Sequence, residues 1–156
     1  MLRGRFGTTS GRPYIDGSLL LSRLDLSLEI SFLVDTGADE SFLMPSDAQG
    51  LLLDYRRLSG RSTGGHGAGG SFTAYREPAL ITFSDGERLF GYSVIIGILE
   101  PRDDMLGVPS LIGRDILHRW RMTYEHSSGI LVFDVESADV IVEAQGPFPE
   151  PAIRPQ

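Results

Sequence analysis

One carboxylate in this chain directly follows a mostly apolar run. Residues 30–34 lead into Asp35, and Thr36 and Gly37 come immediately behind it. A strand that delivers a carboxylate into a tight turn, with a hydroxyl and a glycine after it, can present that carboxylate for acid–base chemistry. The tripeptide alone also fits an ordinary turn, in which Asp35 accepts backbone N–H bonds and Gly37 takes a positive φ. These residues alone leave both interpretations open.

One form of acid–base chemistry uses such a carboxylate as one member of a pair. Two carboxylates that face each other in a partly desolvated site cannot both ionise cheaply, so they share one proton. The ionised member then accepts a proton from a bound water, while the protonated member polarises a carbonyl group. The chain holds a single Asp-Thr-Gly turn. If Asp35 works in this way, the second carboxylate comes from an identical chain across a two-fold axis.

Two further motifs follow the Asp35 turn. The stretch 64–70 is rich in glycine, and the stretch 111–117 has the pattern of a buried strand, a glycine turn and a short helix. In this order the three motifs resemble those of the retroviral-type aspartic peptidases, the retropepsin family, from about Arg12 to about Trp120. The resemblance implies a mostly β, single-domain closed barrel or sandwich with one short C-terminal helix, acting as a homodimer. It also implies an aspartic endopeptidase whose partners are itself and peptide or unfolded polypeptide.

The resemblance assigns roles to the Asp35 turn. Asp35 is the implied catalytic residue. Thr36 is implied to bond across the dyad to the partner's turn, and Gly37 to let peptide substrate approach closely. Ala38 and Glu40 are implied to contact substrate, Ala38 because it is small and Glu40 as part of a specificity pocket.

Asp39 and Arg114 are charged residues inside motifs that otherwise appear apolar and buried, and charges of that kind are usually paired. By the resemblance, Asp39 binds the substrate backbone near the ends of the cleft. Arg114 is implied to pair near the dimer interface with an aspartate of the active loop region, for which Asp39 is the candidate. The alternative is that Arg114 lies on a helix surface, bonded to Asp115 or to solvent.

The glycine-rich stretch has the composition of a flexible hairpin tip. By the resemblance it is a flap that closes over substrate, with Gly65, His66 and Gly67 in contact with the bound peptide. A plain linker is the rival interpretation. A phosphate-binding loop would need a following helix with a lysine, and the chain contains no lysine. His66 at the tip suggests the hypothesis of pH-sensitive closure.

The remaining pattern predicts short strands. Period-two alternation over 24–34 predicts a half-buried strand that leads into Asp35. Strands are also predicted over 79–83 and 89–96, and a hairpin from 121–124 to 130–135. The segment 97–109 carries two prolines and is expected to be a surface loop. We expect one domain over 1–142 and a Pro-rich, disordered tail over 143–156.

Composition excludes several classes of protein. With 156 residues, the chain suffices for one core but not for a two-lobed peptidase. A net charge of -7 without a basic stripe argues against nucleic acid as a partner. There is no cysteine and no metal-ligand spacing, so neither a metal nor another cofactor is expected. No apolar run approaches the roughly 18 residues of a membrane span. With no apolar segment of a secretory signal near the start, we expect a cytoplasmic protein without a membrane partner.

One hypothesis from another class is compatible with the same motifs. A catalytically weak or inactive module could keep the fold and a peptide groove for binding or assembly, because a fold does not determine a function. Retention of Asp35, Thr36 and Gly37 favours the peptidase.

Overall fold

The computed structural model describes residues 1–67 and 70–143, and for residues 61–70 only the backbone is considered. The expected tail lies outside the described residues, except for Glu143, which is the last residue of a strand. The side chain of His66 also lies outside them.

Six strands close into a barrel within the described part of the chain. In hydrogen-bonded order they run β8-β5-β9-β4-β3-β7, and β7 pairs back with β8. The six are β3 (Pro13–Leu21), β4 (Leu26–Val34), β5 (Phe42–Leu43), β7 (Gly70–Ser84), β8 (Arg88–Leu99) and β9 (Leu111–Ile112). The mostly β, closed architecture expected from the sequence is therefore confirmed.

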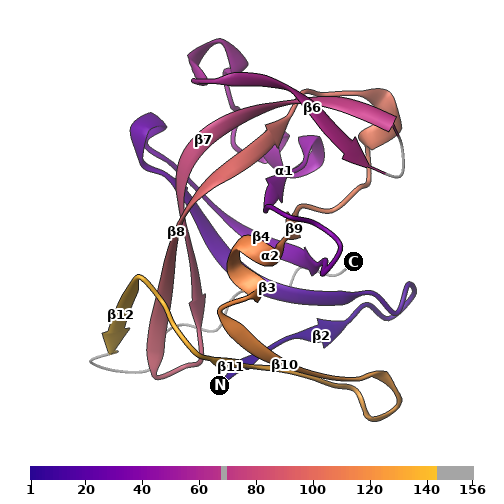
Figure 1. Ribbon diagram of the computed structural model, residues 1–156, viewed down its shortest axis with the longest axis vertical. Helices are drawn as coiled ribbons and strands as arrows, with labels where there is room; N and C mark the ends of the chain where they lie inside the picture. The colour runs from indigo at the N-terminus through magenta and orange to yellow at the C-terminus, as the bar shows by residue number, and fades with distance from the viewer. Residues whose placement is uncertain (68–69, 144–156) are drawn as a thin grey trace.

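Other strands extend this sheet or form a second one. β6 (Arg61–Gly67) pairs with β7, β12 (Val140–Glu143) with β8, and β2 (Arg5–Phe6) with β3. β1 (Leu2–Arg3), β11 (Ile130–Val135) and β10 (Trp120–Glu125) make a separate antiparallel sheet in that order. Figure 1 shows this small sheet at the end of the molecule opposite to the β6–β7 hairpin.

The described helices are short. α1 (Pro45–Gly50) begins with a proline, whose fixed φ suits the first helical turn, and α2 (Arg114–Leu117) is the expected C-terminal helix. Single 3-10 turns occupy η1 (Ser22–Leu24), η2 (Tyr55–Arg57), η3 (Asp103–Met105) and η4 (His126–Ser128). No helix in the described ranges is long and apolar enough to cross a membrane.

The predicted loop over 97–109 is wrong for its first residues. β8 continues to Leu99, and Gly97 pairs with Phe42 of β5. A Cβ at Gly97 would lie 2.3 Å from a ring carbon of Phe42. This glycine therefore permits close packing inside a sheet and does not mark a turn.

The main apolar core takes residues from the barrel strands and from β1, β10 and β11 of the small sheet, and a smaller apolar cluster is separate from it. In the main core, the ring centroid of Trp120 lies 4.9 Å from that of Phe83, and its indole N–H donates to the hydroxyl of Tyr92 at 2.7 Å. The smaller cluster consists of four buried residues, Met44, Ala74, Leu99 and Leu111, with partly exposed side chains packed against them. Met44 directly follows β5, the other three lie in β7, β8 and β9, and Leu33 of β4 packs against the cluster.

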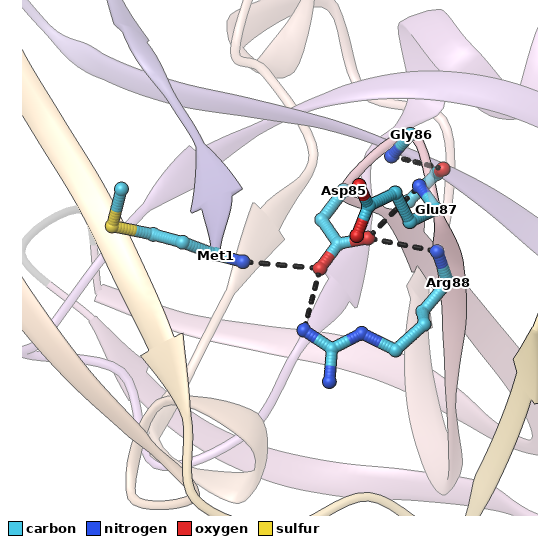
Figure 2. Close-up of polar contacts among 6 residues, drawn as sticks. Met1, Asp85, Gly86, Glu87 and Arg88 are labelled. Carbon is cyan, nitrogen blue, oxygen red and sulfur yellow. Dashed lines mark hydrogen bonds and ion pairs between the residues drawn. The ribbon is translucent and has the colours of Figure 1, made fainter. Parts of the chain in front are cut away.

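The turn between β7 and β8 is organised by one carboxylate (Figure 2). Asp85 is almost buried, and it accepts bonds from the amides of Glu87 and Arg88, from the Arg88 guanidinium and from the amino group of Met1. Burial raises the pKa of this carboxyl, but those donors outweigh burial and hold the pKa well below its usual range. The amino terminus is thereby fixed against the β7–β8 turn.

Candidate active site

Asp35 stands at the point where β4 ends beside β9. The two strands run parallel, with Val34 opposite Ile112, and the amide of Asp35 donates to the carbonyl of Ile112 at 3.1 Å. The chain then turns, because the amide of Ala38 donates back to the carbonyl of Asp35 at 3.3 Å. Asp35 is thus held by backbone bonds on both sides and is half-buried.

The side chain of Asp35 is also oriented locally. Its Oδ1 accepts the amide N–H of Gly37 at 2.9 Å, and a Cβ at Gly37 would lie 3.2 Å from that oxygen. Thr36 and Gly37 are exposed. The turn therefore presents a carboxylate at the surface of this chain with one oxygen fixed by the backbone.

The loop after Asp35 is joined to α2 through backbone groups. The carbonyl of Ala38 accepts the amide of Arg114 at 2.9 Å, and the carbonyl of Asp39 accepts the amide of Asp115 at 3.2 Å. These amides belong to the first turn of a helix and have no partner within it. The loop caps α2, and α2 in turn fixes the course of the loop.

Gly113, just before α2, makes the contact between loop and helix possible. A Cβ there would lie 2.4 Å from the carbonyl oxygen of Glu40 and 2.8 Å from its nitrogen. Real Cβ atoms do not approach backbone atoms so closely, so any side chain would push the two segments apart. The glycine in the downstream motif is therefore required by packing.

The structure brings Asp39 and Arg114 together. The Arg114 guanidinium binds the carboxylate of Asp39, and it also donates to the carbonyl of Thr36 at 3.0 Å. Neither residue is buried: 83% of the Asp39 side chain and 38% of the Arg114 side chain are exposed. The expectation of buried charges is wrong here, since the pair lies on the rim of the loop.

Two buried serines support the loop, and the sequence pattern did not identify their role. Ser41 donates to the carboxylate of Asp115 through its amide at 2.9 Å and its hydroxyl at 2.8 Å, and its Oγ accepts the amide of Gly113 at 3.2 Å. Ser110 donates from Oγ to Asp47 at 2.6 Å and accepts the amide of Met44. Ser110 stands in the mostly apolar stretch 105–112, whereas Ser41 follows two acidic residues, so only Ser110 carried a signal in the sequence.

Glu40 connects the loop to β7. Its carboxylate forms an ion pair with Arg76 at 2.7 Å, with about a third of Glu40 and under half of Arg76 exposed. The bond from Glu40 raises the pKa of the Arg76 guanidinium. Because side chains alternate along a strand, Arg76 shares its face of β7 with Phe72 and Ala74.

The glycine-rich stretch forms the expected hairpin as far as it is described. β6 and β7 pair from Arg61 opposite Tyr75 to Gly67 opposite Gly70, with an irregularity at 63–65. The ring of Phe72, on β7, meets the ring of Phe42 edge to face at 5.5 Å. Phe72 and Phe42 both pack against the smaller apolar cluster, as does Ala38. The second strand of the hairpin thus contacts the same cluster as the loop that follows Asp35.

Among the described residues, no group of three or more His, Cys, Asp or Glu side chains is arranged to hold a metal ion. The residues gathered around Asp35 are instead carboxylates, two arginines and apolar side chains. Such a set suits proton transfer.

Solved structures of aspartic proteases are similar to this chain. A retropepsin-like aspartic protease from Rickettsia conorii matches with a TM-score of 0.52 and 21% identity, over 85% of this chain and 88% of that one. The chain has a retropepsin-like fold. EIAV protease, complexed with the inhibitor HBY-793, matches with a TM-score of 0.49 and 23% identity, over 72% of this chain and 90% of that one. No family model matches the sequence, and no curated protein matches it significantly.

The retropepsin-like fold is the one that the three sequence motifs indicated. In this chain the motifs are in mutual contact: the Asp35 loop bonds to α2, and its Glu40 bonds to the second strand of the glycine-rich hairpin. The fold is thus shared with aspartic proteases, and the residues of the three motifs form one continuous region.

Proposed function

We propose that this protein is an aspartic endopeptidase that acts as a homodimer, with one Asp35 from each chain. The observation that carries the proposal is the carboxylate of Asp35, which a retropepsin-like barrel presents in an exposed turn and which backbone bonds hold on both sides. A single such turn per chain makes an incomplete acid–base pair. A second copy related by a two-fold axis completes it.

The proposed reaction uses water and no covalent intermediate. The ionised Asp35 takes a proton from a water molecule, and the water oxygen attacks the peptide carbonyl carbon. The carbonyl oxygen accepts the proton of the other Asp35, which gives a tetrahedral diol. The protonated Asp35 then gives its proton to the peptide nitrogen, while a hydroxyl of the diol gives its proton to the ionised Asp35. The C–N bond breaks, an amine and a carboxylic acid leave, and the pair again holds one proton.

The neighbours of Asp35 support this chemistry in different ways. Thr36 and Gly37 hold the turn, and the exposure of both leaves them available to the partner's turn. Ala38 and Asp39 border the groove in which an extended peptide lies. Arg114 keeps Asp39 and the carbonyl of Thr36 in place, so it acts on the loop and not on the substrate.

The β6–β7 hairpin is proposed as a flap. Its backbone at Gly65, His66 and Gly67 would donate and accept hydrogen bonds with bound peptide, and closure would exclude water from the reacting groups. The partly exposed rings of Phe42 and Phe72, which pack on the smaller apolar cluster, are proposed as an apolar wall for substrate side chains. The ion pair of Glu40 and Arg76 places two charged side chains near this apolar wall.

Incubation with an unstructured polypeptide between acid and neutral pH, with and without a pepstatin-like inhibitor, tests the proposal. We expect cleavage by the wild type, inhibition by the compound, and no cleavage by Asp35→Asn. The matched control is Asp134→Asn, an exposed position on β11 far along the chain, which should cleave like the wild type. Peptide binding without cleavage under all conditions would favour the binding module instead.

A further inference from the structure

Glu77 is a fully buried carboxylate that the proposed reaction does not use. It lies within β7, and none of its side chain is exposed. Its Oε1 accepts Nε of Arg23 at 2.6 Å, and its Oε2 accepts Nη2 of Arg23 at 3.1 Å. Oε2 also accepts the amide and the hydroxyl of Ser59, each at 3.1 Å.

Stability alone does not explain this carboxylate. The same face of β7 continues with Ala79, Ile81 and Phe83, all buried in the main core. Removing a carboxylate from water is costly, and an apolar residue in place of a buried ion pair often leaves stability unchanged or improved. Burial raises the pKa of Glu77, but the bonds from Arg23 and Ser59 outweigh it and leave the pKa below its usual value. Glu77 is therefore kept ionised on a buried face of β7 that is otherwise apolar from Ala79 to Phe83.

The contacts of Glu77 join three segments that are distant in sequence. Arg23 belongs to η1, between β3 and β4 of the barrel, and its guanidinium also binds the carbonyl of Arg57. Ser59 lies just before β6. Through Glu77, two parts of the hairpin are bound to η1 of the barrel. They are the segment before β6, which contains Ser59, and β7, which contains Glu77 itself.

These contacts lie at the root of the hairpin. The amide of Arg76 donates to the carbonyl of Gly60 at 2.9 Å, and the ladder begins at the next pair, Arg61 opposite Tyr75. Gly60 takes a positive φ of 63°, which few other residues adopt, so the chain turns sharply here. On the opposite face of β7, Arg76 binds Glu40 of the candidate active-site loop. Residues 76 and 77 therefore fasten the root on both faces.

We propose that Glu77 is a positioning residue, which holds the root of the β6–β7 hairpin on the barrel so that the hairpin moves over the Asp35 loop as one piece. The inference depends on the proposed function only in taking this hairpin to cover bound peptide. The anchoring itself concerns the chain with or without substrate.

Hydrogen exchange measures the anchoring, and steady-state kinetics measure its consequence. In Glu77→Gln the charge is lost and one oxygen becomes an amide donor. Exchange of the amides of β6 and residues 57–60 should accelerate about tenfold, while the amides of β3 and β4 stay within about twofold of the wild type. KM for a peptide should rise about tenfold, with kcat changed by less than about threefold.

Two further variants make the result decisive. Glu136→Gln removes the carboxylate of the exposed Arg121 ion pair, away from the hairpin, and should leave exchange and KM unchanged. Ser59→Ala removes only the hydroxyl bond to Glu77 at an exposed position, and should produce the same pattern at about threefold, even if Glu77→Gln does not fold.

Unchanged β6 exchange in both Glu77→Gln and Ser59→Ala would overturn the inference. A uniform rise throughout the barrel with an unchanged KM would also overturn it, because Glu77 would then be merely structural. If the wild type cleaves no peptide, the proposed function fails, while the exchange data still decide whether Glu77 anchors the hairpin.

Discussion

Gly113→Ala tests how the candidate active-site loop is positioned. The added Cβ would lie 2.4, 2.5 and 2.8 Å from the oxygen, carbon and nitrogen of Glu40, all of them backbone atoms. A normal contact requires a displacement of about 1 Å, and no flexible side chain is present to yield. Overpacking of this kind costs about 2–3 kcal/mol. In a chain of this size that corresponds to a fall in Tm of about 5–10 °C.

The matched control is Gly50→Ala. Gly50 ends α1, has no positive φ, and its nearest neighbour to an added Cβ is a methyl of Leu28 at 3.9 Å. Because alanine favours helix over glycine, we expect this variant to be as stable as the wild type or more stable by up to about 1 kcal/mol.

Urea unfolding followed by circular dichroism measures both variants, and peptide cleavage is followed in parallel. The displacement moves the loop that carries Asp35, so cleavage by Gly113→Ala should fall more than the unfolded fraction explains. A Gly113→Ala protein as stable and as active as Gly50→Ala would refute the close contact between α2 and Glu40.

Three further variants test other parts of the structure. Asp85→Asn should lower the free energy of unfolding at pH 7 by about 1–3 kcal/mol. The pKa of Asp85 is lower in the folded protein than the unfolded value of 3.8, so this contribution is lost as the pH falls below about 4. The urea midpoints of variant and wild type should therefore converge there, and a constant difference would contradict this. Ser41→Ala should cost about 1–3 kcal/mol by leaving Asp115 short of a buried donor, and an unchanged midpoint would exclude that bond. Trp120→Phe should lower the free energy of unfolding by about 2 kcal/mol, because the indole bond to Tyr92 is lost and the new ring is smaller. Thermal unfolding measures this change, and no loss of stability would show that the bond contributes nothing.

The sequence predicted those features whose signal is local. Alternation before Asp35 predicted β4, because one face of that strand lies on the core. The apolar–glycine–polar pattern at 111–117 predicted β9 and α2, and the serine–glycine turn predicted the hairpin of β10 and β11. In each case the pattern and the fold depend on neighbours within a few residues.

Features that depend on distant contacts were not predictable in the same way. The strand through Gly97 was expected to be a loop, because nothing nearby in sequence reveals that Phe42 packs on it. The role of Ser41 depends on a carboxylate far along the chain, and that of Glu77 on Arg23 and Ser59. The exposure of Asp39 depends on how the loop folds over α2.

Mixing wild-type protein with Asp35→Asn tests the shared site most directly. If each site needs an Asp35 from both chains, an equal mixture that has exchanged subunits keeps about one quarter of the cleavage rate of the same total concentration of wild type, because only dimers of two wild-type chains are active. Retention of about one half after full exchange would mean that each chain works alone, and it would contradict the proposed mechanism.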